Sequence, residues 1–182
     1  MIVGLTGSIA AGKGVVAEFL KQKGLIYHSL SMEVREETNK RAIEITRSNL
    51  QDLGNELRSK EGAGAWARRF LDKIIEGNYI IDGIRNPAEV AEFEKTENFH
   101  LISIDAPLYE RFKRVVSRNK ESDPKTLEGF LEMNKRDLGE DDPKGQQVAK
   151  CMERAHYSIM NDSDLESLNK KIEAIYAKIK RN

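Results

Sequence analysis

Short apolar runs recur along the chain, and longer stretches with apolar residues three or four positions apart separate them. A continuous apolar run is typical of a strand buried on both faces, whereas the longer spacing is typical of a helix that buries one stripe. Strands that alternate with helices in this way predict an α/β fold with a parallel sheet. The expected strands are residues 2–5, 25–28, 79–82, 100–104 and 157–160.

The helical spacing fills the stretches between these strands. Trp66 and Phe70 recur at this spacing, and we interpret them as core residues. Two helical blocks, residues 31–76 and 108–155, interrupt the regular alternation and predict insertions into one core. The expected helices include residues 15–23, about 65–76, and a last helix that opens at residue 163.

The most informative stretch follows the first expected strand and precedes the first expected helix. A glycine-rich turn in this position lets successive backbone N–H groups point inward at an anion, and the helix adds its positive N-terminal end. Lys13 stands where its side chain reaches the β- and γ-phosphates of a nucleotide. The alternative is a glycine-rich turn that only joins a strand to a helix. The predicted ATP-binding loop consists of Gly7, Ser8, Ile9, Ala10, Ala11, Gly12, Lys13, Gly14 and Val15.

The end of this loop departs from the usual motif. The motif places a Ser or Thr after the lysine, where its hydroxyl contacts Mg²⁺, but here Gly14 and Val15 follow Lys13. Asp82 ends an apolar strand, a place from which a carboxylate holds Mg²⁺, often through water. We therefore expect phosphates, water and Asp82 to hold the metal, with no ligand from residues 14–15. The alternative is that Asp82 only caps a turn.

Two arginines stand where they are expected to meet phosphate groups. Arg85 follows Gly83, which lets a substrate approach the backbone, and is predicted to bind a phosphate bidentately. Arg35 lies just past the second expected strand, at the edge where ligands gather in open parallel sheets, and is predicted to bind the acceptor. For both residues the alternative is an ion pair on the surface.

A basic segment in the second helical block supplies further candidates. Arg111, Arg114 and Arg118 lie three and four residues apart and share one helix face. Such a run is commonly a solvated basic face. Ahead of the polar segment 121–124, it is also typical of a mobile lid that brings arginines onto transferring phosphates. We predict catalytic contacts from Arg114 and Arg118, and one more from Arg136.

Composition narrows the class of protein. With 30 basic and 30 acidic residues among 182, the chain has no net charge, which argues against a nucleic-acid or anionic-membrane partner. No apolar run approaches the roughly 20 residues of a membrane span, and the N-terminus lacks the basic segment of a secretion signal. Cys151 is the single cysteine, so no internal disulfide is possible and we expect a cytoplasmic protein. The oligomeric state stays open.

These segments together resemble the nucleoside monophosphate kinase branch of the P-loop proteins. The resemblance is closest to archaeal adenylate-kinase-related proteins and more distant to dephospho-coenzyme A kinase. It is carried by Gly-Leu-Thr-Gly at 4–7, Gly-Lys at 12–13, Ser-Met at 31–32, Val-Arg-Glu-Glu at 34–37, Ile-Asp-Gly-Ile-Arg at 81–85 and Ser-Asp-Pro-Lys-Thr at 122–126.

The resemblance implies one domain over residues 1–182 with the three-layer fold of P-loop NTPases and a five-stranded parallel sheet. It implies an acceptor-binding insertion at about 31–76 and an arginine-bearing lid at about 108–145. It also implies that Asn161 lies near the donor base. The chain departs from the family's pattern at Val15, where a Thr is usual, and before Val34-Arg35, where the usual acidic residue is missing unless Glu33 takes its place.

We therefore expect an ATP- and Mg²⁺-dependent kinase that transfers the γ-phosphoryl group to the phosphate of a nucleoside monophosphate-like acceptor. Such an acceptor is already ionised, so positioning and charge neutralisation replace a general base. One alternative is a dephospho-coenzyme A kinase-like enzyme, whose hydroxyl acceptor needs a base, with His28 as the candidate. Another is a slow ATPase that acts as a nucleotide-dependent regulator, which Val15 favours. A third alternative, a protein that modulates nucleic acids, is supported only by the basic segment 110–120.

Overall fold

The computed structural model describes residues 1–118, 123–139 and 145–181, while residues 119–122, 140–144 and 182 lie outside the described part. In chain order the elements are β1 (Ile2–Gly7), α1 (Lys13–Gln22), β2 (Ile26–Ser29), α2 (Leu30–Lys40), α3 (Arg47–Glu61), α4 (Ala65–Leu71), β3 (Tyr79–Asp82), α5 (Pro87–Phe93), β4 (Phe99–Asp105), α6 (Leu108–Arg118), α7 (Leu127–Leu138), α8 (Val148–Glu153), β5 (Tyr157–Met160) and α9 (Leu165–Ile179).

The five strands form one parallel sheet in the order β2-β3-β1-β4-β5. β1 lies at its centre, where Gly4 is in register with Ile81 of β3 and Leu101 of β4. All five strands predicted from the apolar runs are present, and the expectation of an α/β fold with a five-stranded parallel sheet is confirmed.

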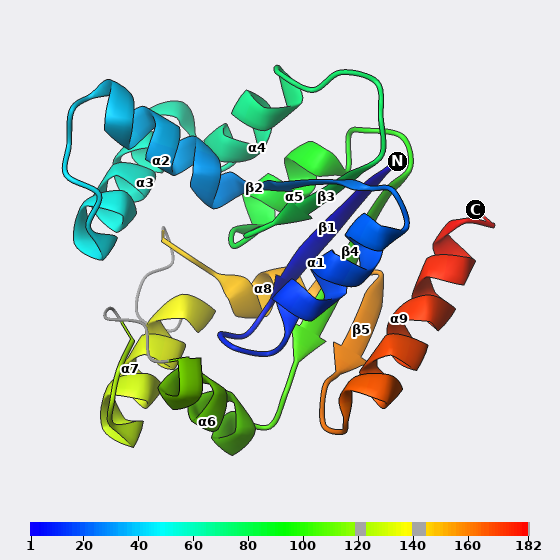
Figure 1. The fold of residues 1–182 in the computed structure, drawn as a ribbon. Coiled ribbons are helices and arrows are strands. Elements are labelled where there is room, and N and C mark those ends of the chain that lie inside the picture. The colour runs from blue at the N-terminus through cyan, green and yellow to red at the C-terminus, as the bar shows by residue number, and fades with distance from the viewer. Residues whose placement is uncertain (119–122, 140–144, 182) are drawn as a thin grey trace.

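Helices cover both faces of the sheet and make three layers (Figure 1). On one face α1 and α9 pack against alternate residues of the strands, among them Val3 and Leu5 of β1. On the other face α4, α5 and α8 pack against Ile2 and its neighbours. Trp66 and Phe70 of α4 are buried in this second cluster, as their spacing predicted.

Several element ends differ from the sequence-based expectation. β1 continues to Gly7 because Thr6 and Gly7 still pair with β4. The helix expected over 65–76 ends at Leu71, since the chain then tightens, with Lys73 N donating to Phe70 O at 3.0 Å. The last helix is capped by Asp164 rather than by Ser163: the Asp164 carboxylate accepts from the N–H of Ser167 at 2.8 Å.

Two helical groups lie at the end of the sheet where the strands finish, one on each side of the turn between β1 and α1 (Figure 1). The first, α2 and α3, is tied to α4 by ion pairs such as Arg69 with Glu37 and with Glu61. In the second, Arg111 of α6 donates to the side chain of Asn134 on α7 at 2.6 Å.

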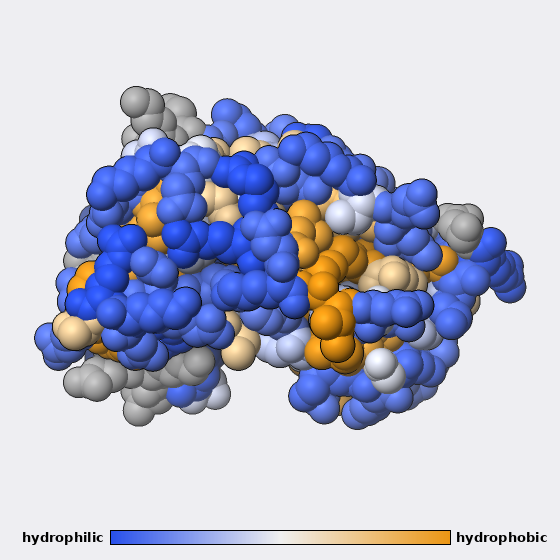
Figure 2. All heavy atoms as spheres, turned by 90° about the horizontal axis from the view of Figure 1, so that it is seen from above, coloured by the Kyte–Doolittle hydropathy of each residue, from blue (hydrophilic) through white to orange (hydrophobic). Residues whose placement is uncertain are grey.

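The outer surface is mostly polar. Figure 2 shows a largely hydrophilic face on which hydrophobic residues gather in one area to the right of the centre. Within the described residues, the helices are too short or too polar to cross a membrane.

Candidate active site

The connections that follow β1 and β3 leave the sheet in opposite directions. The two strands are neighbours, but α1 covers one face of the sheet whereas α5 covers the other. In open parallel sheets such a divergence leaves a crevice at the carboxyl ends of the strands, where ligands bind. Residues 7–12 and 82–85 follow β1 and β3 at this edge of the sheet, and we refer to the site between them as the crevice.

Glycine is required at two positions of the loop between β1 and α1. Gly7 and Gly12 have φ values of 132° and 112°. A Cβ atom on Gly7 would lie 1.9 Å from the carbonyl oxygen of Ile104, and one on Gly12 would lie 2.5 Å from Nδ2 of Asn161. Ala10 also has a left-handed φ of 59°. This curled backbone, with the N-terminus of α1 opening onto it, has the geometry that binds phosphate.

Lys13 lies beneath this loop. Its ammonium group donates to the carbonyl oxygens of Gly7 at 2.7 Å and Ser8 at 2.8 Å. Burial lowers the pKa of Lys13 to about 8, and the nearby positive charge of Arg85 acts in the same direction. The carboxylates of Asp82 and Asp137 oppose this shift by raising the pKa. The Lys13 ammonium group is thus bound by neutral carbonyl oxygens, which phosphate oxygens can replace as its hydrogen-bond acceptors.

Asp82 lies at the end of β3, beside the loop. One carboxylate oxygen accepts from the N–H of Gly83 at 2.7 Å, and the other accepts from the Tyr27 hydroxyl at 3.1 Å. Burial and the Asp82 charge raise the pKa of Tyr27 to about 12, so Tyr27 remains a donor near neutral pH. Both oxygens of Asp82 are therefore oriented before any ligand arrives.

The residues around Asp82 fit a Mg²⁺ ion that takes most of its ligands from a nucleotide. Among the residues that the structure describes, no group of three acidic, histidine or cysteine side chains forms a ready-made cage. Mg²⁺ characteristically keeps several waters and takes one or two carboxylates besides phosphate oxygens. Gly14 and Val15 are both exposed and offer no side-chain oxygen. A metal at this site would therefore depend on Asp82 for its protein contact.

The other side of the site begins at the end of β2. Ser29 caps α2, and its hydroxyl lies 2.9 Å from that of Ser31. A Cβ atom on Gly83 would lie 3.4 Å from the Ser29 hydroxyl, so β2 and β3 end side by side. Arg35 is one helical turn beyond Ser31, is exposed, and pairs with no other described residue. By contrast, carboxylates bind Arg41, Arg58, Arg68 and Arg69 of the same insertion.

Arg85 is fixed through its backbone as well as its side chain. Its N–H donates to the buried carboxylate of Glu89 at 2.8 Å, and its carbonyl oxygen accepts from the N–H of Gln147 at 2.7 Å. The Gln146 side-chain oxygen accepts from Nη1 of Arg85 at 3.1 Å. The remaining guanidinium N–H groups stay available for a phosphate.

The structure brings Arg114 to the loop. Its guanidinium donates to the carbonyl oxygens of Ala10 and Ala11, both at 3.3 Å, and to that of Asn161 at 3.5 Å. Asn161 itself is buried, and its side-chain amide donates to Ala11 at 2.8 Å. Arg114 and Asn161 thus both bind the loop backbone, although each lies more than 100 residues further along the chain.

The other two predicted arginines of this region are placed differently. Arg118 forms a bidentate pair with Asp123 at 2.5 and 2.8 Å. Arg136 is exposed on α7 and makes no ion pair within the described part of the chain. The next residue, Asp137, is the α7 side chain that acts on Lys13. The remaining parts of the expected lid, residues 119–122 and 140–144, lie outside the described residues.

Sequence reasoning missed several side chains of the crevice. Asp137, Gln146 and Tyr27 reach it from three distant segments, and no local motif marks them. Arg111 was part of the basic run, but it is buried and ties Ala106 to Asn134 instead of facing solvent.

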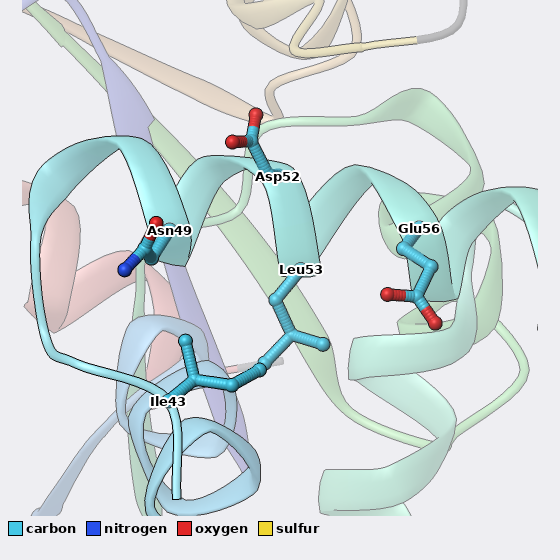
Figure 3. A pocket seen from close by; sticks show the side chains of 5 residues that line it. All are labelled: Ile43, Asn49, Asp52, Leu53 and Glu56. Atoms are coloured by element: carbon cyan, nitrogen blue, oxygen red, sulfur yellow. The ribbon is translucent and has the colours of Figure 1, made fainter. Parts of the chain in front are cut away.

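A separate cavity lies in the first insertion, away from the loop. It has a volume of about 380 Å³, and Ile43, Asn49, Asp52, Leu53 and Glu56 line it (Figure 3). The carboxylate of Glu56 is engaged by Arg41 and Lys60. This cavity therefore offers no free group for phosphate chemistry.

Comparison with known proteins agrees with this architecture. The sequence model of the AAA domain family matches residues 3–138. A UPF0200 protein of Pyrococcus horikoshii is 33% identical over 190 residues, which cover 100% of this chain and 99% of that protein. A UPF0200/UPF0201 protein of Archaeoglobus fulgidus is 35% identical, and the match covers 100% of this chain but only 56% of that protein. The chain therefore belongs to the UPF0200 family and carries an AAA-type P-loop domain.

Among solved structures, a shikimate kinase from Bacteroides thetaiotaomicron has the same fold. The TM-score is 0.63 at 12% identity, and the match covers 99% of this chain and 98% of that one. At this identity the likeness concerns the fold, which is that of P-loop kinases.

Proposed function

We propose that this member of the UPF0200 family is an ATP- and Mg²⁺-dependent phosphotransferase related to adenylate kinases, whose acceptor is a nucleoside monophosphate-like phosphate. The observation that carries the proposal is the convergence of Lys13, Asp82 and Arg85 on one crevice, with the unpaired Arg35 on its acceptor side. A cation without a carboxylate partner, in an insertion whose neighbouring arginines are paired, is suited to an anionic ligand.

In this proposal Lys13 exchanges its two carbonyl partners for oxygens of the β- and γ-phosphates. Bound Mg²⁺ would neutralise phosphate charge, and Asp82 would hold it directly or through water. Arg85 and Arg35 would bind the acceptor phosphate, which attacks without a general base because it is already ionised. Arg114, which already contacts the loop, would neutralise charge on the transferring phosphoryl group.

Three further assignments belong to the same proposal. Residues 31–76 would form the acceptor-binding insertion, and residues 108–145 would form a lid over the donor. Within the lid, Arg118 would have to exchange its Asp123 partner for a phosphate before acting on it. Asn161, which already contacts the loop, would lie near the donor base.

A kinase with a hydroxyl acceptor is the second candidate. Asp137 favours it, since a carboxylate within electrostatic range of Lys13 is where a base would act. The earlier candidate for that base is less suitable, because His28 packs on Phe70 and its Nε2 lies 3.1 Å from the buried Glu33 carboxylate.

One assay separates these functions. The protein is incubated with ATP and Mg²⁺ and, in separate reactions, with nucleoside monophosphates, dephospho-coenzyme A, shikimate or water alone, and ADP release is measured. We expect a nucleoside monophosphate to accelerate release and Lys13→Ala to abolish it in a folded protein. Acceleration only by a hydroxyl acceptor would favour the second candidate. Acceleration by none would favour a slow ATPase, and a fully active Lys13→Ala variant would contradict all of them.

A further inference from the structure

A hydrogen-bonded bridge joins α7 to Arg85 across the crevice. The Gln146 side chain donates to the carboxylate of Asp137 at 3.1 Å and accepts from Nη1 of Arg85 at 3.1 Å. Because a carboxylate only accepts and a guanidinium only donates, each end fixes the orientation of the amide between them.

The backbone around Gln146 is fixed as well. Gln147 N donates to the carbonyl oxygen of Arg85 at 2.7 Å, and Asn86 donates to that of Gly145 at 2.9 Å. The cap of α7 closes on the same segment, since a Cβ atom on Gly139 would lie 2.6 Å from the carbonyl oxygen of Gln146. These contacts hold Gln146 beside Arg85, and Gln146 in turn holds the carboxylate of Asp137.

The charge of Asp137 bears on Lys13. The two residues lie within electrostatic range of each other, and no lysine or arginine among the described residues forms an ion pair with Asp137. Asp137 thus acts as a counter-ion of Lys13. The phosphates of ATP need the same cation, and they would approach against this negative charge.

We propose that the Asp137–Gln146–Arg85 bridge is a latch that holds an acidic side chain near Lys13 and weakens ATP binding until it opens. The inference rests on the proposed function, because it takes Lys13 as the receiver of the phosphates. An anion that takes the Arg85 guanidinium from Gln146 removes one end of the latch. Binding of an anion to Arg85 would therefore strengthen the binding of ATP at Lys13.

The test is a mutant cycle read out by ATP affinity, measured by titration calorimetry with ATP and Mg²⁺. Asp137→Asn keeps the shape of the side chain and removes its charge. We expect it to tighten ATP binding by about fivefold or more, the lower end of usual coupling between sites. In the Gln146→Ala background the same change should alter the affinity by less than about twofold, because Asp137 is no longer held.

Glu132→Gln is the matched control, since Glu132 is an exposed acid on the same helix. It should leave ATP affinity unchanged within about twofold, as expected for an exposed, screened charge. Gln146→Met, which fills the same space without a hydrogen bond, replaces Gln146→Ala if the latter fails to fold.

Each remaining outcome decides against the latch. Unchanged or weaker binding by Asp137→Asn overturns it, and so does equal tightening in both backgrounds. Equally tighter ATP binding by Glu132→Gln would show that the loss of any negative charge on α7 has this effect, and that the bridge plays no part. If the wild type binds no ATP, both the proposed function and the latch are wrong. If it binds ATP but Asp137→Asn has the same effect with and without Gln146→Ala, only the latch is wrong.

Discussion

Restoring the missing loop hydroxyl is the sharpest test of how this site holds Mg²⁺. Gly14 is the second residue of α1, is exposed, and has no φ in the left-handed region. A Cβ atom at this position would meet nothing within 4 Å. The backbone therefore does not require glycine here, and Gly14→Ser and Gly14→Ala should both fold.

The two variants separate a stability effect from a metal effect. Replacing a helical glycine stabilises by about 0.5–1 kcal/mol. In a domain of this size this corresponds to a rise in Tm of about 1–4 °C. Both variants should show it. The serine variant alone adds an oxygen for the metal, and an interaction with a charged group contributes about 1.5–3 kcal/mol. The Mg²⁺ concentration needed for ATP binding should therefore fall about tenfold or more for serine relative to alanine.

The assay is ATP titration over a series of free Mg²⁺ concentrations, with thermal unfolding of the same samples. Equal Mg²⁺ dependence of the two variants would show that position 14 does not face the metal, and the reasoning from the loop motif would fail. A lower Tm for Gly14→Ala would refute the open space at Gly14. Val15→Thr is a parallel test, because it places a hydroxyl where the family that the chain resembles usually carries a Thr.

Three other predictions concern charge. Because the pKa of Lys13 is about 8 and bound phosphates would raise it, ATP binding should take up roughly half a proton at pH 8 and about a tenth at pH 7; calorimetry in buffers of different ionisation enthalpy measures this, and Lys13→Arg should abolish it. Arg35→Gln should raise the acceptor KM about tenfold or more without lowering Tm, whereas Arg41→Gln should leave the KM unchanged; equal effects would contradict the role of Arg35. Burial lowers the pKa of His100, so its contribution to stability is complete above about pH 6.5 and is lost as the pH falls. Urea unfolding of His100→Gln should lose less stability than wild type between pH 7 and 5, and parallel losses would refute this.

The strands and the phosphate loop could be predicted because their signals are local. Apolar runs specify buried strands, and Gly7 to Lys13 carry their geometry in consecutive residues. The missing hydroxyl was also visible in the sequence, since it concerns only Gly14 and Val15. Element ends were less accurate, because they depend on contacts such as that between Lys73 and Glu33.

The far side of the crevice could not be predicted in this way. Asp137 and Gln146 meet Arg85 only through the fold, from segments more than 50 residues away. Consecutive residues on a helix point in directions about 100° apart, so Arg136 and Asp137 cannot serve the same surface. The lid hypothesis pointed to Arg136, while the neighbouring Asp137 carries the contact to Gln146.

The attachments of α6 and α7 bear on how the proposed lid would move. Arg111 and the packing of Phe112 on Phe130, with ring centres 5.6 Å apart, join the two helices, so they would move together. The block touches the donor loop through Arg114, whose bonds are long at 3.3–3.5 Å, whereas the bonds of residues 145–147 to Arg85 and Asn86 are shorter, at 2.7 and 2.9 Å. Since longer hydrogen bonds are weaker, the contacts of Arg114 would break first. In the proposed lid, α6 and α7 would then leave the loop while residues 145–147 stay bound to Arg85 and Asn86.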